Sequence, residues 1–152
     1  MYIIPCETED DGFLPTKAYE GTSAAFDLKA YFNFDKGEGQ IIIPPLGRHL
    51  ISTAVKMNIP EGMVGMVCPR SGLALNKGIT VLNAPGVIDP GYVNTVGVIL
   101  INLGSEPVTI THGDKIAQLL IVDTQDVVLS TSRKLDTNTI RGYNGYGSSD
   151  KT

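Results

Sequence analysis

The chain has 152 residues, of which 42 % are hydrophobic and 18 % charged, and this size and composition fit one domain that needs neither a disulfide nor a metal to hold its core. Its 12 basic and 16 acidic residues give a net charge of −4, which argues against a general binder of nucleic acids or anionic membranes. Cys6 and Cys68 form no disulfide framework and no metal-ligand spacing, so we interpret them as free thiols.

The sequence contains no targeting or membrane signal. The first ten residues lack the basic and apolar regions of a secretory signal. The apolar run at 96–101 is far shorter than a membrane span. We therefore expect a soluble cytoplasmic protein, in the host cytoplasm if the source is viral, with no membrane partner and no direct nucleic-acid partner.

Short β-branched runs, separated by glycine and proline, dominate the chain. In chain order we expect strands at 40–43, 49–55, 63–67, 79–82, 96–101, 108–110, 116–122 and 127–129. This spacing predicts an all-β fold, as a sandwich, jelly roll or barrel. One short helix is expected at 71–76, with Ser71 as its N-cap and Gly78 near its end.

Five polar segments could carry chemistry, although each also has an ordinary structural explanation. Asp27, set among apolar residues, is either an acid that accepts backbone hydrogen bonds or a hard-oxygen ligand for Mg²⁺. Arg70 precedes Ser71 and Gly72 at the expected helix start. Free N–H groups there, with the guanidinium, would suit a phosphate, but a capped helix beside a surface arginine explains the pattern equally well.

The next two segments are turns that enter or join strands. Asp89 lies in an Asp-Pro-Gly bend followed by Tyr92. An ordinary β-turn is the simpler explanation, and a general base beside an aromatic face is the functional one. Gln118 interrupts an apolar run and needs a hydrogen-bond partner, which is either the backbone or a ligand.

The fifth segment is the C-terminal tail at 141–152, which is rich in Gly, Tyr and Ser. Such a composition predicts a disordered tail unless it orders on a ligand. On a nucleotide, Arg141 would pair with phosphate while Tyr143 or Tyr146 stacked on a base. Together the five segments offer a base, two arginines, a helix start, a carboxylate and an aromatic tail, which suits displacement at a nucleoside polyphosphate.

These segments, in this order, resemble the five motifs of the trimeric all-β dUTPases (deoxyuridine triphosphatases). The most specific are PRSGLA at 69–74, GVID at 86–89, GDKIAQ at 113–118 and RGYNGYGS at 141–148. The likeness extends over roughly residues 13 to 149, which is nearly the whole chain.

The resemblance implies a homotrimeric, distorted jelly-roll β-barrel or sandwich, with one short helix after the PRSGLA motif and a flexible C-terminal arm. Residues 1–140 would form the barrel domain, and residues 141–152 an arm that closes over an active site shared between subunits. The implied reaction is Mg²⁺-dependent hydrolysis of dUTP to dUMP and pyrophosphate. It would limit uracil incorporation into DNA and supply dUMP for thymidylate synthesis.

The resemblance also implies roles for single residues. Asp89 would be the catalytic base that activates water for in-line attack on the α-phosphorus, and Tyr92 would pack under the deoxyribose and exclude a 2′-hydroxyl. Asp27 would hold Mg²⁺ through water, with the substrate phosphates as direct ligands. The hairpin backbone would read uracil, a neighbouring chain would supply Gln118, and a third chain would supply the arm. The implied substrate-binding residues are Arg70, Ser71, Gly72, Asn83, Gly86, Val87, Ile88, Tyr92, Val98, Gln118, Arg141, Tyr146, Gly147 and Ser148.

Two functions are alternatives to dUTP hydrolysis. A dCTP deaminase would use a glutamate on the strand after the bend, but residues 95–102 contain no acid. A regulatory protein on the same fold would use nucleotide occupancy to control a protein partner, whose identity the sequence does not suggest. As a sole role this would predict loss of the catalytic residues, yet Asp89, Arg70, Gln118 and Arg141 are all present.

Overall fold

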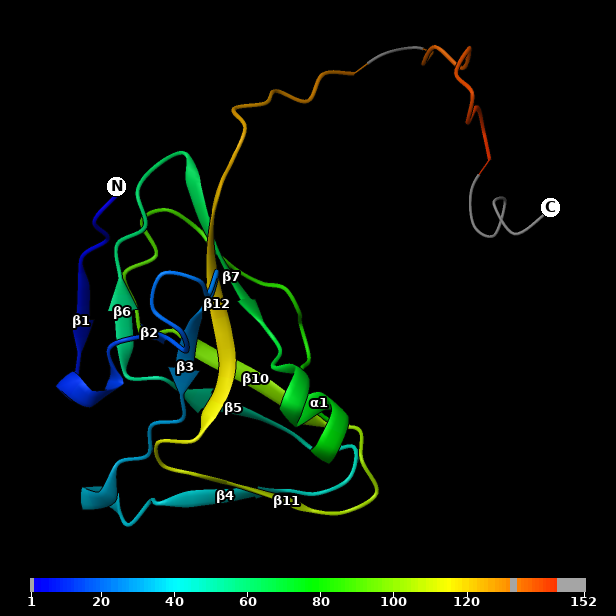
Figure 1. Ribbon diagram of the computed structural model, residues 1–152. Coiled ribbons are helices and arrows are strands. Elements are labelled where there is room, and N and C mark those ends of the chain that lie inside the picture. The colour runs from blue at the N-terminus through cyan, green and yellow to red at the C-terminus, as the bar shows by residue number, and fades with distance from the viewer. Residues whose placement is uncertain (1, 132–133, 145–152) are drawn as a thin grey trace.

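The computed structural model describes residues 2–131 and 134–144 and contains antiparallel β-sheets with one short α-helix, a jelly-roll-like all-β fold (Figure 1). The elements are β1 (Cys6–Thr8), η1 (Asp11–Phe13), β2 (Thr16–Lys17), β3 (Phe26–Lys29), η2 (Phe34–Lys36), β4 (Gln40–Ile43), β5 (Arg48–Ser52), β6 (Val55–Met57), β7 (Met63–Cys68), α1 (Ser71–Lys77), β8 (Ile79–Val81), β9 (Gly86–Ile88), β10 (Gly97–Asn102), β11 (Val108–Thr111) and β12 (Lys115–Asp123).

Four sheets build the body of the molecule. The largest has the order β2-β3-β12-β7-β9, and a three-stranded sheet has the order β5-β10-β8. Two further pairs, β1-β6 and β11-β4, complete the described strands. In Figure 1, β12 crosses in front of β10 and β5. The core lies between the sheets because alternate strand residues face inward, as the strictly alternating burial of β7 shows.

The core is apolar and closely packed. Leu28, Val55, Leu100 and Ala117 are among its least exposed members. Each large apolar side chain buried in this way contributes about 1.5–3 kcal/mol, so the β-branched runs stabilise the fold as well as favouring extended backbone. Asn102 is also fully buried, and it donates to the carbonyls of Ile43 (2.9 Å) and Glu106 (2.8 Å).

Most of the expected strands are confirmed within a residue or two at each end, but two expectations were wrong. The run at 49–55 is split into β5 and β6, because Ala54 adopts a positive φ of 58° that no extended strand allows. The run at 127–129 is not a strand. Its side chains are 71–96 % exposed, and no described strand pairs with it.

The helix α1 begins inside the PRSGLA motif rather than after it. Arg70, not Ser71, is the N-cap residue, and it has extended backbone and no side-chain capping bond. Gly78 ends the helix as expected. Its φ of 67° is left-handed, and its N–H donates to the carbonyls of Ala74 and Leu73.

The chain leaves the body after β12. Residues 124–131 and 134–144 form no strand or α-helix and run away from the sheets (Figure 1). No helix among the described residues is long and apolar enough to cross a membrane.

Candidate active site

A cavity of about 210 Å³ lies where the chain passes from one sheet to the other. β8 and β10 pair antiparallel and form a hairpin, but β9 between them pairs with β7 in the five-stranded sheet. The segment between β8 and β10 therefore crosses between sheets and encloses a hollow. The cavity is lined by Val67, Val81, Asn83, Gly86, Val87, Ile88, Asp89, Tyr92, Val96, Gly97, Val98 and Ile99.

All seven residues assigned from the sequence to this segment line the cavity. They are Asn83, Gly86, Val87, Ile88, Asp89, Tyr92 and Val98. The walls combine valine and isoleucine side chains with polar surface. Gly86 allows close packing, since a Cβ there would come 3.3 Å from atoms of Val67 and Asn83. A flat ring with a few polar edges suits such a hollow.

The bend at the cavity mouth is a tight β-turn. The N–H of Tyr92 donates to the carbonyl of Asp89 (3.2 Å), and Gly91 has a φ of 78°. Proline followed by a positive-φ glycine is the pattern of a type II turn. This turn leaves the Asp89 carboxylate exposed at the rim. The hydroxyl of Tyr92 donates to the carbonyl of Thr95 (3.3 Å), and this bond restrains the Tyr92 ring next to the turn.

The backbone of β9 can supply polar groups to the cavity. β9 is the outer strand of the five-stranded sheet, so one of its edges has no described strand beside it. A strand edge presents alternating N–H donors and C=O acceptors. Such an edge matches a nucleobase that carries donors and acceptors along one side.

A second group of candidate residues meets at the ends of β3, β7 and β12. Asp27 is buried, and its Oδ1 lies 3.3 Å from Nε of Arg70. Its Oδ2 lies 2.8 Å from Nζ of Lys115, yet this buried oxygen has no hydrogen bond of acceptable geometry. The contact is therefore an ion pair without an aligned hydrogen bond.

Gln118 lies in the same cluster and has a backbone partner. It pairs in register with Asp27 on β3 and with Cys68 on β7, so the three side chains share one face of the sheet. Its Nε2 donates to the carbonyl of Pro69 (2.8 Å). This bond ties the end of β7 to β12 and holds the backbone that leads into α1.

Exposed backbone amides begin the helix beside these side chains. Ser71 and Gly72 are exposed residues of the first turn, where N–H groups have no partner within the helix. Arg70 also donates from Nη1 to the carbonyl of Lys115 (3.0 Å). Arg70, Lys77 and Lys115 line a cavity of about 430 Å³ with Gly113 and Asp114.

The two groups do not share a cavity within one chain. Asp27, Arg70, Ser71, Gly72 and Gln118 are absent from the lining of the 210 Å³ cavity. Arg141 is exposed in the C-terminal segment, and its Nε donates to the carbonyl of Asn144 (3.1 Å). Tyr146, Gly147 and Ser148 lie outside the described residues.

Lys115 is a member of the cluster that the sequence argument missed. It stands directly before the apolar run of β12 and looked like part of the turn at 113–115. The sequence does show that Lys115 lies three residues before Gln118. In a regular strand this spacing puts the two side chains on opposite faces, and only a bulge between them brings both to one face. The register of β12 against β3 contains that irregularity, between Lys115 and Ala117.

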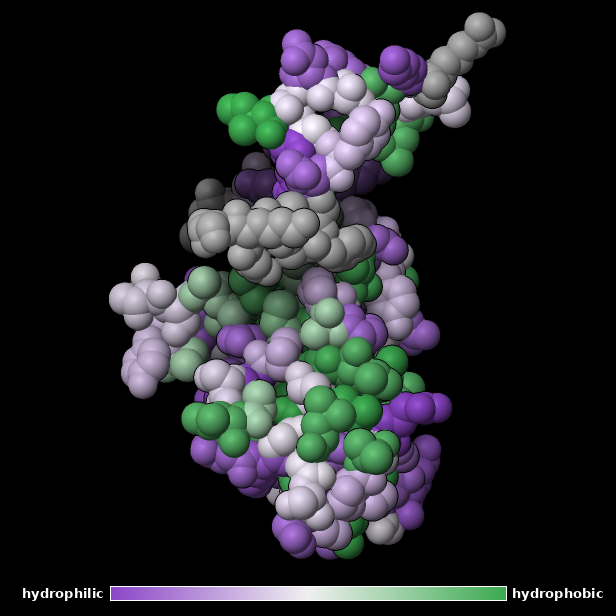
Figure 2. All heavy atoms as spheres, turned by 90° about the vertical axis from the view of Figure 1, so that its right-hand side faces the viewer, coloured by the Kyte–Doolittle hydropathy of each residue, from purple (hydrophilic) through white to green (hydrophobic). Residues whose placement is uncertain are grey.

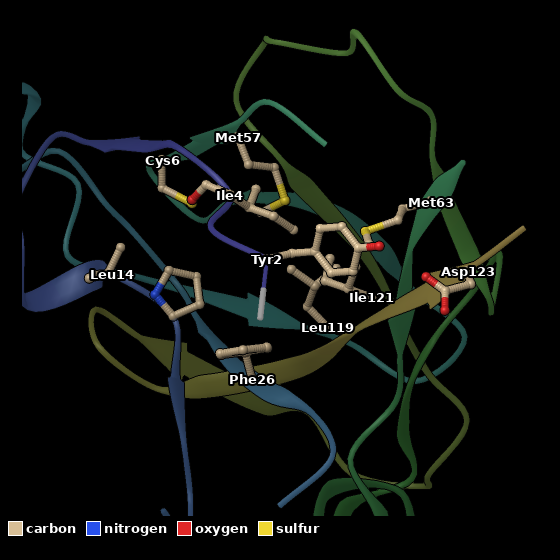
Figure 3. A pocket seen from close by; sticks show the side chains of 11 residues that line it. Tyr2, Ile4, Cys6, Leu14, Phe26, Met57, Met63, Leu119, Ile121 and Asp123 are labelled. Carbon is tan, nitrogen blue, oxygen red and sulfur yellow. The ribbon is translucent and has the colours of Figure 1, made fainter. Parts of the chain in front are cut away.

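A larger cavity of about 500 Å³ lies elsewhere, between the N-terminal segment and the five-stranded sheet (Figure 3). Tyr2, Ile4, Phe26, Met63 and Leu119 contribute to its apolar wall. Cys6 also lines it, and desolvation raises the pKa of this thiol, which makes it a poorer nucleophile at neutral pH. Among the described residues its lining includes the acid Asp123 but no Lys, Arg or His, so this cavity offers no cation to a phosphate.

The donor set for a metal is sparse. Among residues 2–131 and 134–144, no group of three or more His, Cys, Asp or Glu side chains could hold an ion by itself. Asp27 does offer a buried oxygen that lacks a hydrogen bond. Such an oxygen fits a metal whose other ligands come from water or a bound molecule.

Comparisons with known proteins identify relatives of this chain. A sequence model described as dUTPase matches residues 11–150. A deoxyuridine 5′-triphosphate nucleotidohydrolase of Clostridium novyi (strain NT) is 42 % identical over 148 residues, which cover 97 % of this chain and 98 % of the relative. A protein of the same name from Mesorhizobium japonicum is 47 % identical over 137 residues, covering 89 % of this chain and 82 % of the relative.

Solved structures show the same fold. A mutant dUTPase of Staphylococcus bacteriophage 80alpha, solved with dUpNHpp, has a TM-score of 0.81 at 22 % identity and covers 98 % of this chain and 99 % of its own. A mutant dUTPase from phage phi11 of S. aureus, which coordinates a structural Mg(II) ion, has a TM-score of 0.75 at 21 % identity, over 89 % and 99 % of the two chains. Given the family match and the sequence identities above 40 %, the chain belongs to the dUTPase family.

Proposed function

We propose that this chain, as a dUTP diphosphatase, hydrolyses dUTP to dUMP and pyrophosphate by in-line attack of a water molecule on the α-phosphorus, with Asp89 as the general base. The observation that carries the proposal is the cavity between β8 and β10, because every residue assigned to it from the sequence lines it, Asp89 included. An exposed carboxylate on a rigid turn can accept a proton from water at the mouth of a nucleobase pocket.

Uracil specificity would come from the cavity backbone. The free edge of β9 supports this role, since its N–H and C=O groups can match the donor and acceptors of uracil as a base pair would. Cytosine presents an amine where uracil has a carbonyl, so it would meet the wrong backbone group. Tyr92 would pack under the deoxyribose and leave no room for a 2′-hydroxyl. Its hydrogen bond to the Thr95 carbonyl supports this role because it restrains the ring.

The triphosphate would lie against the second group of residues. The guanidinium of Arg70 and the backbone N–H groups of Ser71 and Gly72 suit phosphate oxygens, and Gln118 would join them with its side-chain amide. The protein is acidic overall, at a net charge of −4, so this local group would have to neutralise the substrate.

The residues present fit a Mg²⁺ ion that enters with the nucleotide. Because the described residues lack a cluster of three metal ligands, the phosphates would be the direct ligands and Asp27 would contribute through bound water. The unbonded Oδ2 of Asp27 is the atom that supports this role. When bound, Mg²⁺ would neutralise phosphate charge and polarise the phosphoryl oxygens.

We propose a homotrimer in which one subunit supplies the hairpin cavity, a second supplies Arg70, Ser71, Gly72 and Gln118, and a third supplies the arm at 141–152. Within one chain none of these four residues lines the hairpin cavity, and Arg70 lines a different cavity, which supports this arrangement. In the arm, Arg141, Tyr146, Gly147 and Ser148 would close over the base and terminal phosphates. Closure would also exclude bulk water during the reaction.

A solvent-exposed row of apolar side chains, formed by Leu50, Ile99 and Leu82, supports contact between subunits. Leu50 on β5 pairs in register with Ile99 on β10, and the N–H of Leu82 donates to the carbonyl of Ile99. Leu50 and Leu82 are 64 % and 45 % exposed. Figure 2 shows hydrophobic side chains gathered on one part of the visible face of the body rather than scattered singly. Gathered apolar surface is typical of protein interfaces.

Replacement of Leu50 by glutamate is expected to dissociate the trimer, because a charge would be buried in the apolar row. Light scattering should give a mass near three chains for the unaltered protein and a lower mass for Leu50→Glu. Thr109→Glu is the control, since it places the same charge on an exposed residue of β11. A monomeric unaltered protein would rule out the shared site.

The proposed substrate is tested by pyrophosphate release from dUTP, UTP, dTTP and dCTP, with and without Mg²⁺. We expect turnover of dUTP alone, and much faster turnover with Mg²⁺. Rapid hydrolysis of UTP would contradict the role of Tyr92. Ammonia released from dCTP would instead support the deaminase alternative, and failure to turn over any nucleotide would leave regulation by nucleotide binding as the better hypothesis.

In a cell this reaction would remove dUTP before a polymerase could incorporate uracil into DNA, and it would supply dUMP for thymidylate synthesis. Both consequences follow from the substrate and product of the proposed reaction. A regulatory protein partner is compatible with the same fold and would be a second role, for which the described residues offer no distinct surface.

A further inference from the structure

We propose that Lys115 is an exchangeable counter-ion, paired with Asp27 in the free protein and transferred to the phosphates of the substrate when Mg²⁺·dUTP binds. This inference rests on the proposed function and adds Lys115 to its binding residues. It begins from the contact of 2.8 Å between Nζ of Lys115 and the buried Oδ2 of Asp27.

The strand irregularity in β12 directs Lys115 to this position. Lys115 pairs with Lys29, and Gln118 pairs with Asp27. Lys115 and Gln118 are three residues apart on β12, whereas their partners Lys29 and Asp27 are only two residues apart on β3. Asp27 and Lys29 share one face of the sheet because they are two residues apart. Lys115 and Gln118 therefore share that face as well, which a regular strand would not allow.

The two cations around Asp27 are held differently. The guanidinium of Arg70 is held on two sides, by Oδ1 of Asp27 at 3.3 Å and by the carbonyl of Lys115 at 3.0 Å. The ammonium of Lys115 has one described ion pair, with Asp27, and its side chain is 41 % exposed. A lysine ammonium on a flexible four-carbon stem reorients more easily than a guanidinium held in a fork. Lys115 is therefore the cation that can leave.

Charge compensation favours the exchange. A buried carboxylate needs cationic partners, so in the free protein Asp27 keeps Lys115 beside Oδ2 as well as Arg70 beside Oδ1. With Mg²⁺·dUTP bound, Oδ2 of Asp27 would be satisfied through water held by the ion. The Lys115 ammonium would be repelled by the dication and attracted to the phosphates. Lys115 lines the 430 Å³ cavity beside Arg70, so its ammonium has room to turn outward.

The first test measures steady-state kinetics of Lys115→Met in the full-length protein. We expect the KM for dUTP to rise about tenfold, equivalent to about 1.4 kcal/mol, with kcat changed less than about threefold because the lost contact is made in both ground and transition states. Lys115→Arg keeps the charge and should restore most of the KM. Lys56→Met is the matched control, since Lys56 is also half exposed and ion-paired, with Glu7 at 3.7 Å.

The second test needs no catalysis. Without the ammonium, Oδ2 of Asp27 is open to a cation, so MgCl₂ alone should raise the melting temperature of Lys115→Met by about 2 °C or more over NaCl of equal ionic strength. The unaltered protein and Lys56→Met should show no such difference. Lys115→Gln keeps a hydrogen-bond donor near Asp27 without the charge, and it replaces Lys115→Met if that variant does not fold.

The outcomes separate this inference from the proposed function. An unchanged KM in both uncharged variants would overturn the transfer to phosphate, and no Mg²⁺-dependent shift in either would overturn the competition at Asp27. If the unaltered protein did not hydrolyse dUTP, the proposed function would fail. The melting experiment would still decide whether Lys115 competes with a cation for Oδ2 of Asp27.

Discussion

Replacement of Asp89 by asparagine is expected to lower kcat for dUTP about a thousandfold, with binding of dUTP retained. The side chain keeps its size and its place on the turn closed by the bond from Tyr92 to the Asp89 carbonyl, but an amide cannot accept a proton from water. Loss of a positioned general base costs 10²–10⁴ in rate. Single-turnover kinetics and calorimetric binding of dUTP measure the two effects separately.

The matched control for this substitution is Asp126→Asn, an equally conservative change of an exposed acid beyond β12. It should leave kcat within about twofold, as is usual for surface changes away from a site. Near-normal turnover of Asp89→Asn would show that another group activates the water. Loss of dUTP binding would instead show that Asp89 is needed for the shape of the cavity.

Truncation after Ile140 is expected to lower turnover of dUTP about a hundredfold while the trimer persists. It removes Arg141, with its bidentate guanidinium, and the aromatic residues proposed to cover the base, so the reacting groups would be less well positioned. The apolar row of Leu50, Ile99 and Leu82 is untouched, which is why assembly should survive. Pyrophosphate release and light scattering on the same sample test both statements.

Truncation after Asp150 is the control for the arm, because it removes only Lys151 and Thr152 and none of the residues proposed to close over the substrate. Its activity should match that of the full chain. Full activity after removal of residues 141–152 would contradict the proposed role of the arm, and a monomeric truncated protein would show that the arm acts through assembly.

Local sequence patterns predicted the strands well where hydrophobic periodicity and breakers agree. The strands β7, β8, β10, β11 and β12 fall where β-branched runs lie between glycine and proline residues. The C-terminal end of α1 was also predictable, because Gly78 supplies the left-handed backbone that the helix end requires. The seven cavity residues were identified from motif resemblance, and their common lining of one hollow is consistent with that identification.

Short strands were not predictable in the same way. β1, β2 and β9 have three residues or fewer, too few for a period-2 pattern to stand out from a loop. The equally short β8 was predicted because it lies in a β-branched run that continues to Leu82. Conversely, the apolar run at 127–129 has the composition of a strand but has no described strand beside it. A strand needs a partner for its backbone groups, and composition does not say whether one is present.

The sequence by itself therefore determined the all-β class, the turn that carries Asp89 and the identity of most candidate residues, because these depend on local backbone preferences and on motifs. Only the tertiary structure decided that β9 joins the five-stranded sheet, that Arg70 and the hairpin line different cavities, and that Lys115 meets Asp27. These relations join residues far apart in the chain through strand register, and a single bulge in β12 changes which side chains share a face.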